Sequence, residues 1–130
     1  EFGFPLLWDA HSIRSLIPHL FDGKLPDFNI GTHSGASCDA EVAERLVAVC
    51  ADAPAYRHIL NGRFKGGHIT RHYGQPQDNV HAVQLELAQC NYMDEQAPFG
   101  YREDLAAPTA QVLRKMLETF LAWGRERYGR

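Results

Sequence analysis

The sequence predicts an α/β protein in which a layered sheet is covered by helices. Three observations support this class. Short apolar or alternating runs typical of strands recur along the chain, two longer segments carry apolar residues at the spacing of amphipathic helices, and the two kinds of segment alternate. The 130 residues suffice for one core, so we predict a single domain spanning residues 1–130.

The first half of the chain contains two predicted strands and one predicted helix. Residues 4–10 form a continuous apolar run typical of a buried strand, and residues 28–31 form a second short run. Ser37 or Asp39 can cap a helix that continues to about Ala51. A loop joins the two strands.

The second half contains a predicted hairpin, a strand and a helix. Residues 56–76 hold two short β-like runs around Asn-Gly and Gly-Gly turn signals. Residues 80–89 alternate as a strand does, and residues 108–129 form a helix with Pro108 in its first turn. Its expected apolar stripe consists of Val112, Leu113, Met116, Leu117, Phe120 and Leu121.

Composition excludes several classes of partner. The net charge of -3 and the scattered basic residues argue against binding to nucleic acid. The sequence contains no run of about 18 apolar residues, so no membrane-spanning helix is predicted. Cys38, Cys50 and Cys90 match no metal-binding spacing and are expected to be reduced thiols of a cytoplasmic protein. Cys38 and Ser34 lie near His33 in the sequence, but nucleophile–base pairs form in space, so this proximity is weak support for either as a nucleophile.

Asp9 and His11 are the first candidate site residues. Two positions apart on a strand, they project from the same face. A metal-binding histidine usually donates its second ring N–H to a carboxylate or carbonyl, so Asp9 is placed to orient His11 or to bind a substrate beside it. The alternative is a histidine at a strand end that bonds only to backbone.

Glu86 is a carboxylate within the predicted strand 80–89. Alternation puts it on one face with Ala82 and Gln84, opposite Val83, Leu85 and Leu87. If that face is buried, Glu86 needs a partner or a function, and its raised pKa would suit a general base. If the face is open to water, Glu86 is simply solvated. The sequence leaves both interpretations open.

The segment NGRFKGGHITRHYG concentrates basic and aromatic side chains among glycines. Glycine lets backbone approach a ligand closely, and arginine holds carboxylates through two parallel hydrogen bonds. This composition favours a pocket for a small anionic molecule, although a charged hairpin in solvent would have the same composition. The side chains concerned are Arg63, Lys65, His68, Arg71, His72 and Tyr73.

Four segments together closely resemble the N-formylglutamate amidohydrolase (deformylase) family of histidine degradation. They are LWDAHSIRS (7–15), LPDFNIGTHSGASC (25–38), NGRFKGGHITRHYGQP (61–76) and VHAVQLELAQCNYMDE (80–95). The resemblance extends from about Phe4 to the last helix. It implies a hydrolase fold of the phosphorylase/hydrolase-like, zinc carboxypeptidase and aspartoacylase type, of which this chain would be an incomplete C-terminal portion.

The resemblance also implies roles for individual residues. His11 would supply one ligand of a catalytic Zn2+, and the other two ligands, a histidine and an acidic residue, would lie upstream of Glu1. Glu86 would serve as general base and proton shuttle, with Asp9 supporting His11. The residues expected to hold the substrate are Arg71, Arg63, Arg14 and Asn61.

The implied reaction is metal-dependent hydrolysis of N-formyl-L-glutamate, a small anionic substrate, to formate and glutamate. Two alternatives remain open: a related amidohydrolase for another N-acyl amino acid, and a non-catalytic dicarboxylate-binding fragment. The chain enters a core strand almost at once, so we expect a fragment that binds zinc weakly and turns over little by itself. Core exposed at such an edge would favour association into a homo-oligomer.

Overall fold

The computed structural model, which describes residues 4–129, contains one mixed four-stranded sheet with the strand order β1-β4-β2-β3. Strand β1 (Leu6–Ile13) runs parallel to β4 (His81–Ala88). Strand β2 (Phe28–Gly31) is antiparallel to β4 and parallel to the short β3 (His58–Leu60). The centre of the sheet is therefore β4, and β1 lies at one edge.

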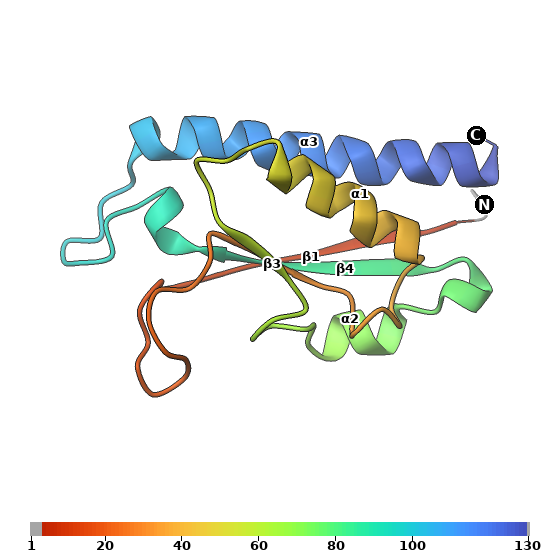
Figure 1. Ribbon diagram of the computed structural model, residues 1–130, viewed down its shortest axis with the longest axis horizontal. Helices are drawn as coiled ribbons and strands as arrows, with labels where there is room; N and C mark the ends of the chain where they lie inside the picture. Colours follow the sequence, from red (N-terminus) through yellow and green to blue (C-terminus); the bar gives the residue numbers. More distant parts are fainter. Residues whose placement is uncertain (1–3, 130) are drawn as a thin grey trace.

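Helices lie on both faces of this sheet, as the predicted α/β class requires (Figure 1). Helices α1 (Ala40–Ala51) and α3 (Glu103–Tyr128) cover one face side by side, and α2 (His68–Tyr73) lies on the other. Two short 3-10 turns flank β4, at Pro76–Asp78 and Gln89–Asn91. Among the residues that the structure describes, no helix combines the length and apolarity needed to cross a bilayer.

The hydrophobic core lies between the sheet and the α1–α3 layer. Strand β4 is buried along its whole length, with alternate side chains entering the core or facing α2. Asp39 caps α1 by accepting a hydrogen bond from the backbone N–H of Glu41, which confirms one of the two expected caps. The core residues include Phe28, Ile30, Val42, Leu46, Val83, Leu85, Leu87, Met116, Phe120 and Trp123.

The first strand extends further than the sequence pattern predicts. The expected range was 4–10, whereas β1 ends at Ile13 because its pairing with β4 continues through Ile13 opposite Ala88. The polar residues Asp9 and His11 therefore lie within the strand. The strand is half-buried and not fully buried, since it forms an edge of the sheet.

The predicted hairpin over residues 56–76 is wrong in its second half. The first run forms β3, but the second forms helix α2, whose first turn closes with a hydrogen bond from Arg71 N–H to the Gly67 carbonyl. The β-branched Ile69 and Thr70 resemble a strand in sequence. Thr70 is fully buried in the finished fold, so tertiary packing outweighs its local preference.

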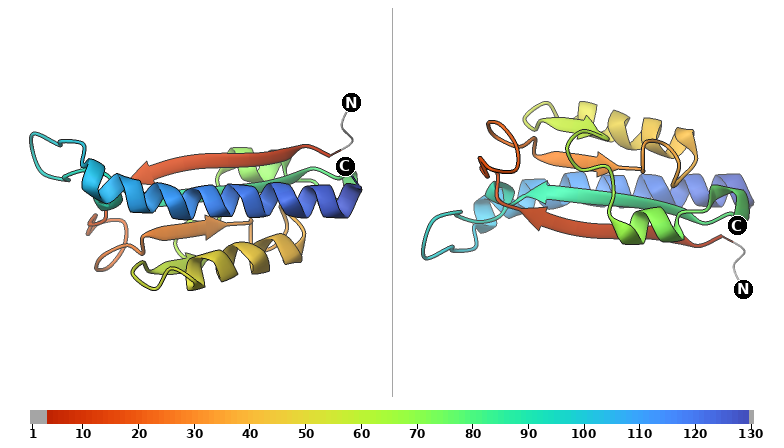
Figure 2. Two further views of the ribbon diagram at one scale, coloured as in Figure 1. Left: turned by 90° about the horizontal axis from the view of Figure 1, so that it is seen from above. Right: turned by 90° about the horizontal axis from the view of Figure 1, so that it is seen from below.

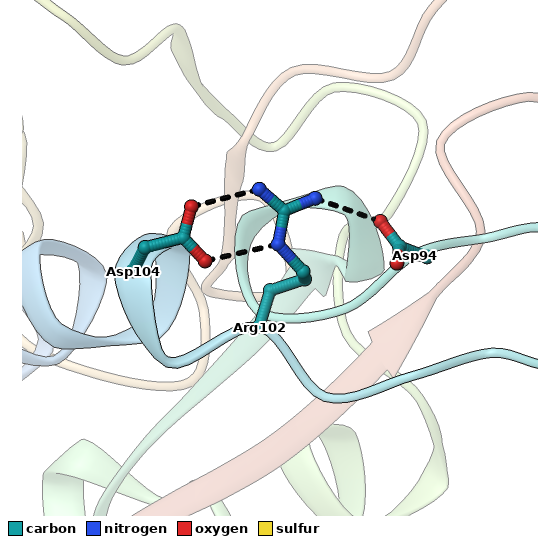
Figure 3. Close-up of polar contacts among 3 residues, drawn as sticks. All are labelled: Asp94, Arg102 and Asp104. Atoms are coloured by element: carbon teal, nitrogen blue, oxygen red, sulfur yellow. Dashed lines mark hydrogen bonds and ion pairs between the residues drawn. The ribbon is translucent and has the colours of Figure 1, made fainter.

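The last helix begins five residues earlier than predicted, at Glu103, and Pro108 is its sixth residue. Arg102 fixes this start: its guanidinium forms two hydrogen bonds with Asp104, at 2.9 and 2.7 Å, and one with Asp94 at 2.9 Å (Figure 3). The acidic first turn also suits the helix dipole. Two members of the expected stripe, Leu117 and Leu121, are exposed instead of buried.

Candidate active site on the β1–β4 face

Four polar side chains gather where β1 and β4 run side by side. The parallel register places Asp9 opposite Gln84 and His11 opposite Glu86. Paired residues of neighbouring strands project from the same face, so all four side chains lie on the α2 side of the sheet. Together with Gly67, His68 and Ile69 they line a hollow of about 260 Å³.

Asp9 holds the ring of His11 by a direct hydrogen bond. The carboxylate can only accept, so His11 Nε2–H donates to Asp9 Oδ1 over 2.9 Å. The Asp9 side chain is 12% exposed and that of His11 is 49% exposed, so the acid is the fixed partner. In a neutral imidazole that donates through Nε2, the lone pair of Nδ1 is free, and this is the form in which an imidazole binds a metal ion.

Glu86 is buried, with only 8% of its surface exposed. The sequence left open whether this face of the strand is buried or open to water, and the structure shows that it is buried. Burial raises the pKa of this carboxyl, His11 lowers it, and Asp9 raises it again. A carboxylate in such surroundings accepts a proton more readily than one in water. This is the property that a general base needs.

Helix α2 is tied to the site through Gln84. The N–H of Gly67, the residue before the helix, donates to Gln84 Oε1 over 2.8 Å. His68, the first residue of α2, therefore lines the hollow beside Glu86. The sequence indicated His68 only as one of six side chains in a basic segment, and nothing in that segment distinguished His68 from the others.

The loop that leads into α2 lies directly against β2. A Cβ atom on Gly31 would lie 2.7 Å from the carbonyl carbon of Lys65, so a larger residue there would collide with this loop. The His33 N–H donates to the Lys65 carbonyl over 2.7 Å and closes the contact. Glycine is thus needed at position 31 to bring the loop, and α2 after it, onto the sheet.

The predicted substrate-binding arginines do not line the hollow. Arg71 is exposed on α2, three residues after His68 and so close to the same side of the helix. Arg63 donates from Nε to the Leu20 carbonyl over 3.0 Å, and its guanidinium lies 5.7 Å from the Phe64 ring centroid. Arg14 is exposed, one residue after the end of β1.

Asn61, also predicted to bind substrate, uses its side chain within the fold. Its Oδ1 accepts hydrogen bonds from the backbone N–H groups of Thr32 and Ser34, at 2.8 and 3.3 Å. Its Nδ2 donates to Thr32 Oγ1 over 2.8 Å. These contacts hold the turn after β2 and engage both ends of the amide.

The cysteine nucleophile considered above finds no support in the structure. Cys38 is buried, and burial followed by the nearby Asp39 raises the pKa of its thiol to about 12. The thiolate form that attacks substrates is therefore scarce at neutral pH.

His11 fits the role of one metal ligand, but residues 4–129 do not complete a metal centre. Within that range there is no group of three or more His, Cys, Asp or Glu side chains placed to hold one ion. A catalytic zinc site generally has three protein ligands and one open position. His11, with its Nδ1 left free by Asp9, is the donor that this part of the chain offers.

Comparisons with known proteins identify relatives of this chain. A sequence model of the N-formylglutamate amidohydrolase family matches residues 1–93. The chain is 74% identical over 128 residues to an N-formylglutamate deformylase of Pseudomonas aeruginosa, and 70% identical over 130 residues to one of Pseudomonas putida. The matches cover 98% and 100% of the chain.

The chain spans about half the length of these relatives, 48% and 49% respectively. Its fold is similar to the crystal structure of N-formylglutamate amidohydrolase from Ralstonia eutropha JMP134, with a TM-score of 0.74 at 20% sequence identity. That match covers 99% of this chain and 46% of the crystallised one.

Proposed function

Because the chain belongs to the N-formylglutamate amidohydrolase family, we propose that it forms part of an enzyme that hydrolyses N-formyl-L-glutamate to formate and L-glutamate. The observation that carries this proposal is the buried Glu86, paired in register with His11 and close to Asp9. A carboxyl group with a raised pKa, such as Glu86, beside an oriented imidazole, such as His11, is an arrangement that can activate water for hydrolysis.

In the proposed reaction Glu86 accepts a proton and then donates it. As a carboxylate it removes a proton from the water that attacks the formyl carbon, and as an acid it then returns the proton to the departing amine. Burial favours the protonated form of Glu86, which helps the first step, and the return of the proton restores the starting carboxylate. Asp9 keeps the His11 ring in one orientation throughout.

A divalent metal, which we propose to be zinc, would be held by Nδ1 of His11 together with ligands from outside residues 4–129. When bound, such an ion supplies Lewis-acid polarisation of the amide carbonyl. The support within this chain is the donor chemistry of His11, with one nitrogen bonded to a carboxylate and the other free.

The substrate carboxylates are proposed to pair with arginine. Arg71 is the first candidate, because it follows by three residues on α2 the His68 that lines the hollow. Arg63 and Arg14 are exposed and lie in loops, so they are the next candidates for binding the substrate carboxylates. The reaction would serve histidine degradation in the cytoplasm. The free thiols Cys38, Cys50 and Cys90 support a reducing compartment.

The test is Glu86→Gln in a protein of full family length that contains this chain. We expect kcat to fall by about a hundredfold to ten-thousandfold while KM changes little, because the amide keeps the shape but takes no proton. Glu44→Gln, the same change on an exposed face of α1, is the matched control. A Glu86→Gln enzyme with the kcat of the control would remove Glu86 from the reaction.

A further inference from the structure

A second hollow adjoins the candidate site. It measures about 390 Å³ and differs from the first in being almost entirely apolar. Ile69 lines both hollows, so the two form one continuous surface with a polar and an apolar end. At the apolar end, Ile69 is 42% and Tyr73 is 54% exposed. The residues that line the apolar end are Pro5, Leu6, Leu7, Ile69, Tyr73 and Val80.

The same surface includes an unpaired sheet edge. Strand β1 pairs with β4 on one side, and within residues 4–129 no strand pairs with its other side. A free edge eight residues long exposes a row of backbone donors and acceptors that natural proteins normally pair or cover.

The covering of this face is also incomplete. Parallel strands are nearly always covered by helices on both faces. Here α2, with six residues, covers about 9 Å along a strand of eight residues that is about 26 Å long. The view from below shows α2 over one end of β1 and β4 only (Figure 2).

We propose that this edge and apolar hollow dock the part of the family's chain that lies outside these residues, through a strand beside β1 and apolar side chains against Ile69 and Tyr73. The curated relatives are about twice as long as this chain, so a segment of comparable length is available as the occupant. The hollow has no charged side chain in its lining, which suits an apolar core contact. The docked part would also border Asp9 and His11, which lie on the same strand and face as Leu7.

The test compares two aliphatic residues that are equally exposed in this chain, Ile69 at 42% and Leu121 of α3 at 43%. Ile69→Lys and Leu121→Lys are made in a protein of full family length that contains this chain. Thermal unfolding is followed without substrate, so the result does not depend on the proposed reaction. We expect Ile69→Lys to lower Tm by about 5 °C or more beyond Leu121→Lys, because a docked segment would bury the lysine.

Equal losses of Tm for the two variants would overturn the proposal, because they would leave Ile69 as exposed in the full protein as it is here. An excess loss at Ile69 that disappears when the protein is diluted to monomers would also overturn it, since a second copy would then be the occupant. If Ile69→Lys gives no folded protein, Ile69→Ala and Leu121→Ala are compared in the same way, with the larger loss again expected at Ile69.

Discussion

At the scale of single residues, the candidate site depends on the different surroundings of Asp9, His11 and Glu86. Asp9 is largely buried and bonds to His11, whereas Glu86 is buried without a hydrogen bond from either of them. The first arrangement fixes an imidazole and the second raises the pKa of a carboxyl. Two acids on neighbouring strands thus acquire different chemistry from their surroundings alone.

Asn61 illustrates a residue whose fold role and predicted binding role can be separated by experiment. Asn61→Ala removes the acceptor for Thr32 and Ser34, and we expect a loss of about 1–3 kcal/mol in the free energy of unfolding. Asn61→Asp keeps the acceptor and tolerates the positive φ of 52° at this position, so it should recover much of that loss. Denaturant unfolding of both variants measures this.

If Asn61 instead holds a substrate carboxylate directly, Asn61→Asp is expected to impair substrate binding. Its negative charge would repel the substrate, so KM would rise strongly although stability is restored. An Asn61→Asp protein that is stable and has the KM of the parent would assign Asn61 to the turn alone.

At the scale of elements, His81 joins β4 to both ends of the helical layer. Its Nδ1 accepts from the Asp39 N–H at the start of α1 over 3.0 Å, and its Nε2 bonds to Tyr128 Oη near the end of α3 over 2.7 Å. Its ring packs edge-on against Trp123. Burial lowers the pKa of His81, with Asp39 raising it and Arg127 lowering it.

This arrangement predicts loss of stability in acid. The unfolded chain takes up a proton on His81 near its ordinary pKa of 6.5. The folded chain resists because burial disfavours the charged ring, and because a protonated Nδ1 would face the Asp39 N–H as a second donor. Stability should therefore fall as pH drops below about 6.5, by up to about 1.4 kcal/mol per pH unit from this residue until the lowered pKa is reached.

Urea unfolding of the parent and of His81→Gln at about pH 7 and about pH 5 measures this contribution. The variant is expected to be less stable at neutral pH, and its deficit should shrink toward acid because glutamine does not titrate. His19→Gln, on the exposed loop after β1, controls for the chemical change itself. A deficit that stays constant between the two pH values would contradict the assignment.

At the scale of the whole molecule, the chain has a complete helical layer on one face and a partial cover on the other (Figure 2). The covered face contains the core, and the partly covered face contains Asp9, His11 and Glu86. The candidate site therefore lies on the partly covered face, where the proposed docked segment would border it.

Metal content tests whether these residues suffice for the candidate site. We expect the isolated chain to hold zinc weakly and to show little deformylase turnover, because His11 alone supplies too few of the protein ligands that a catalytic zinc needs. A protein of full family length should hold about one zinc per chain. Elemental analysis and formate release measure the two quantities. One tightly bound zinc in the isolated chain, with turnover, would show that these residues suffice.

The sequence by itself determined those parts of the protein that depend on local patterns. The alternation in residues 80–89 predicted β4 and placed Glu86 and Gln84 on one face of that strand. The spacing of Asp9 and His11 likewise placed these two side chains on one face of β1. Capping chemistry located the start of α1 at Asp39. The four family-like segments led to the same family that the comparisons show.

The tertiary structure decided what depends on contacts between distant segments. The β1–β4 register brought His11 beside Glu86, and the strand order made β4 central, which buries Glu86 and raises its pKa. The Gln84–Gly67 contact joins the start of α2 to the sheet, and His68 lines the hollow as a result. Neither result could be read from periodicity, because burial and pairing arise only when separate elements pack together.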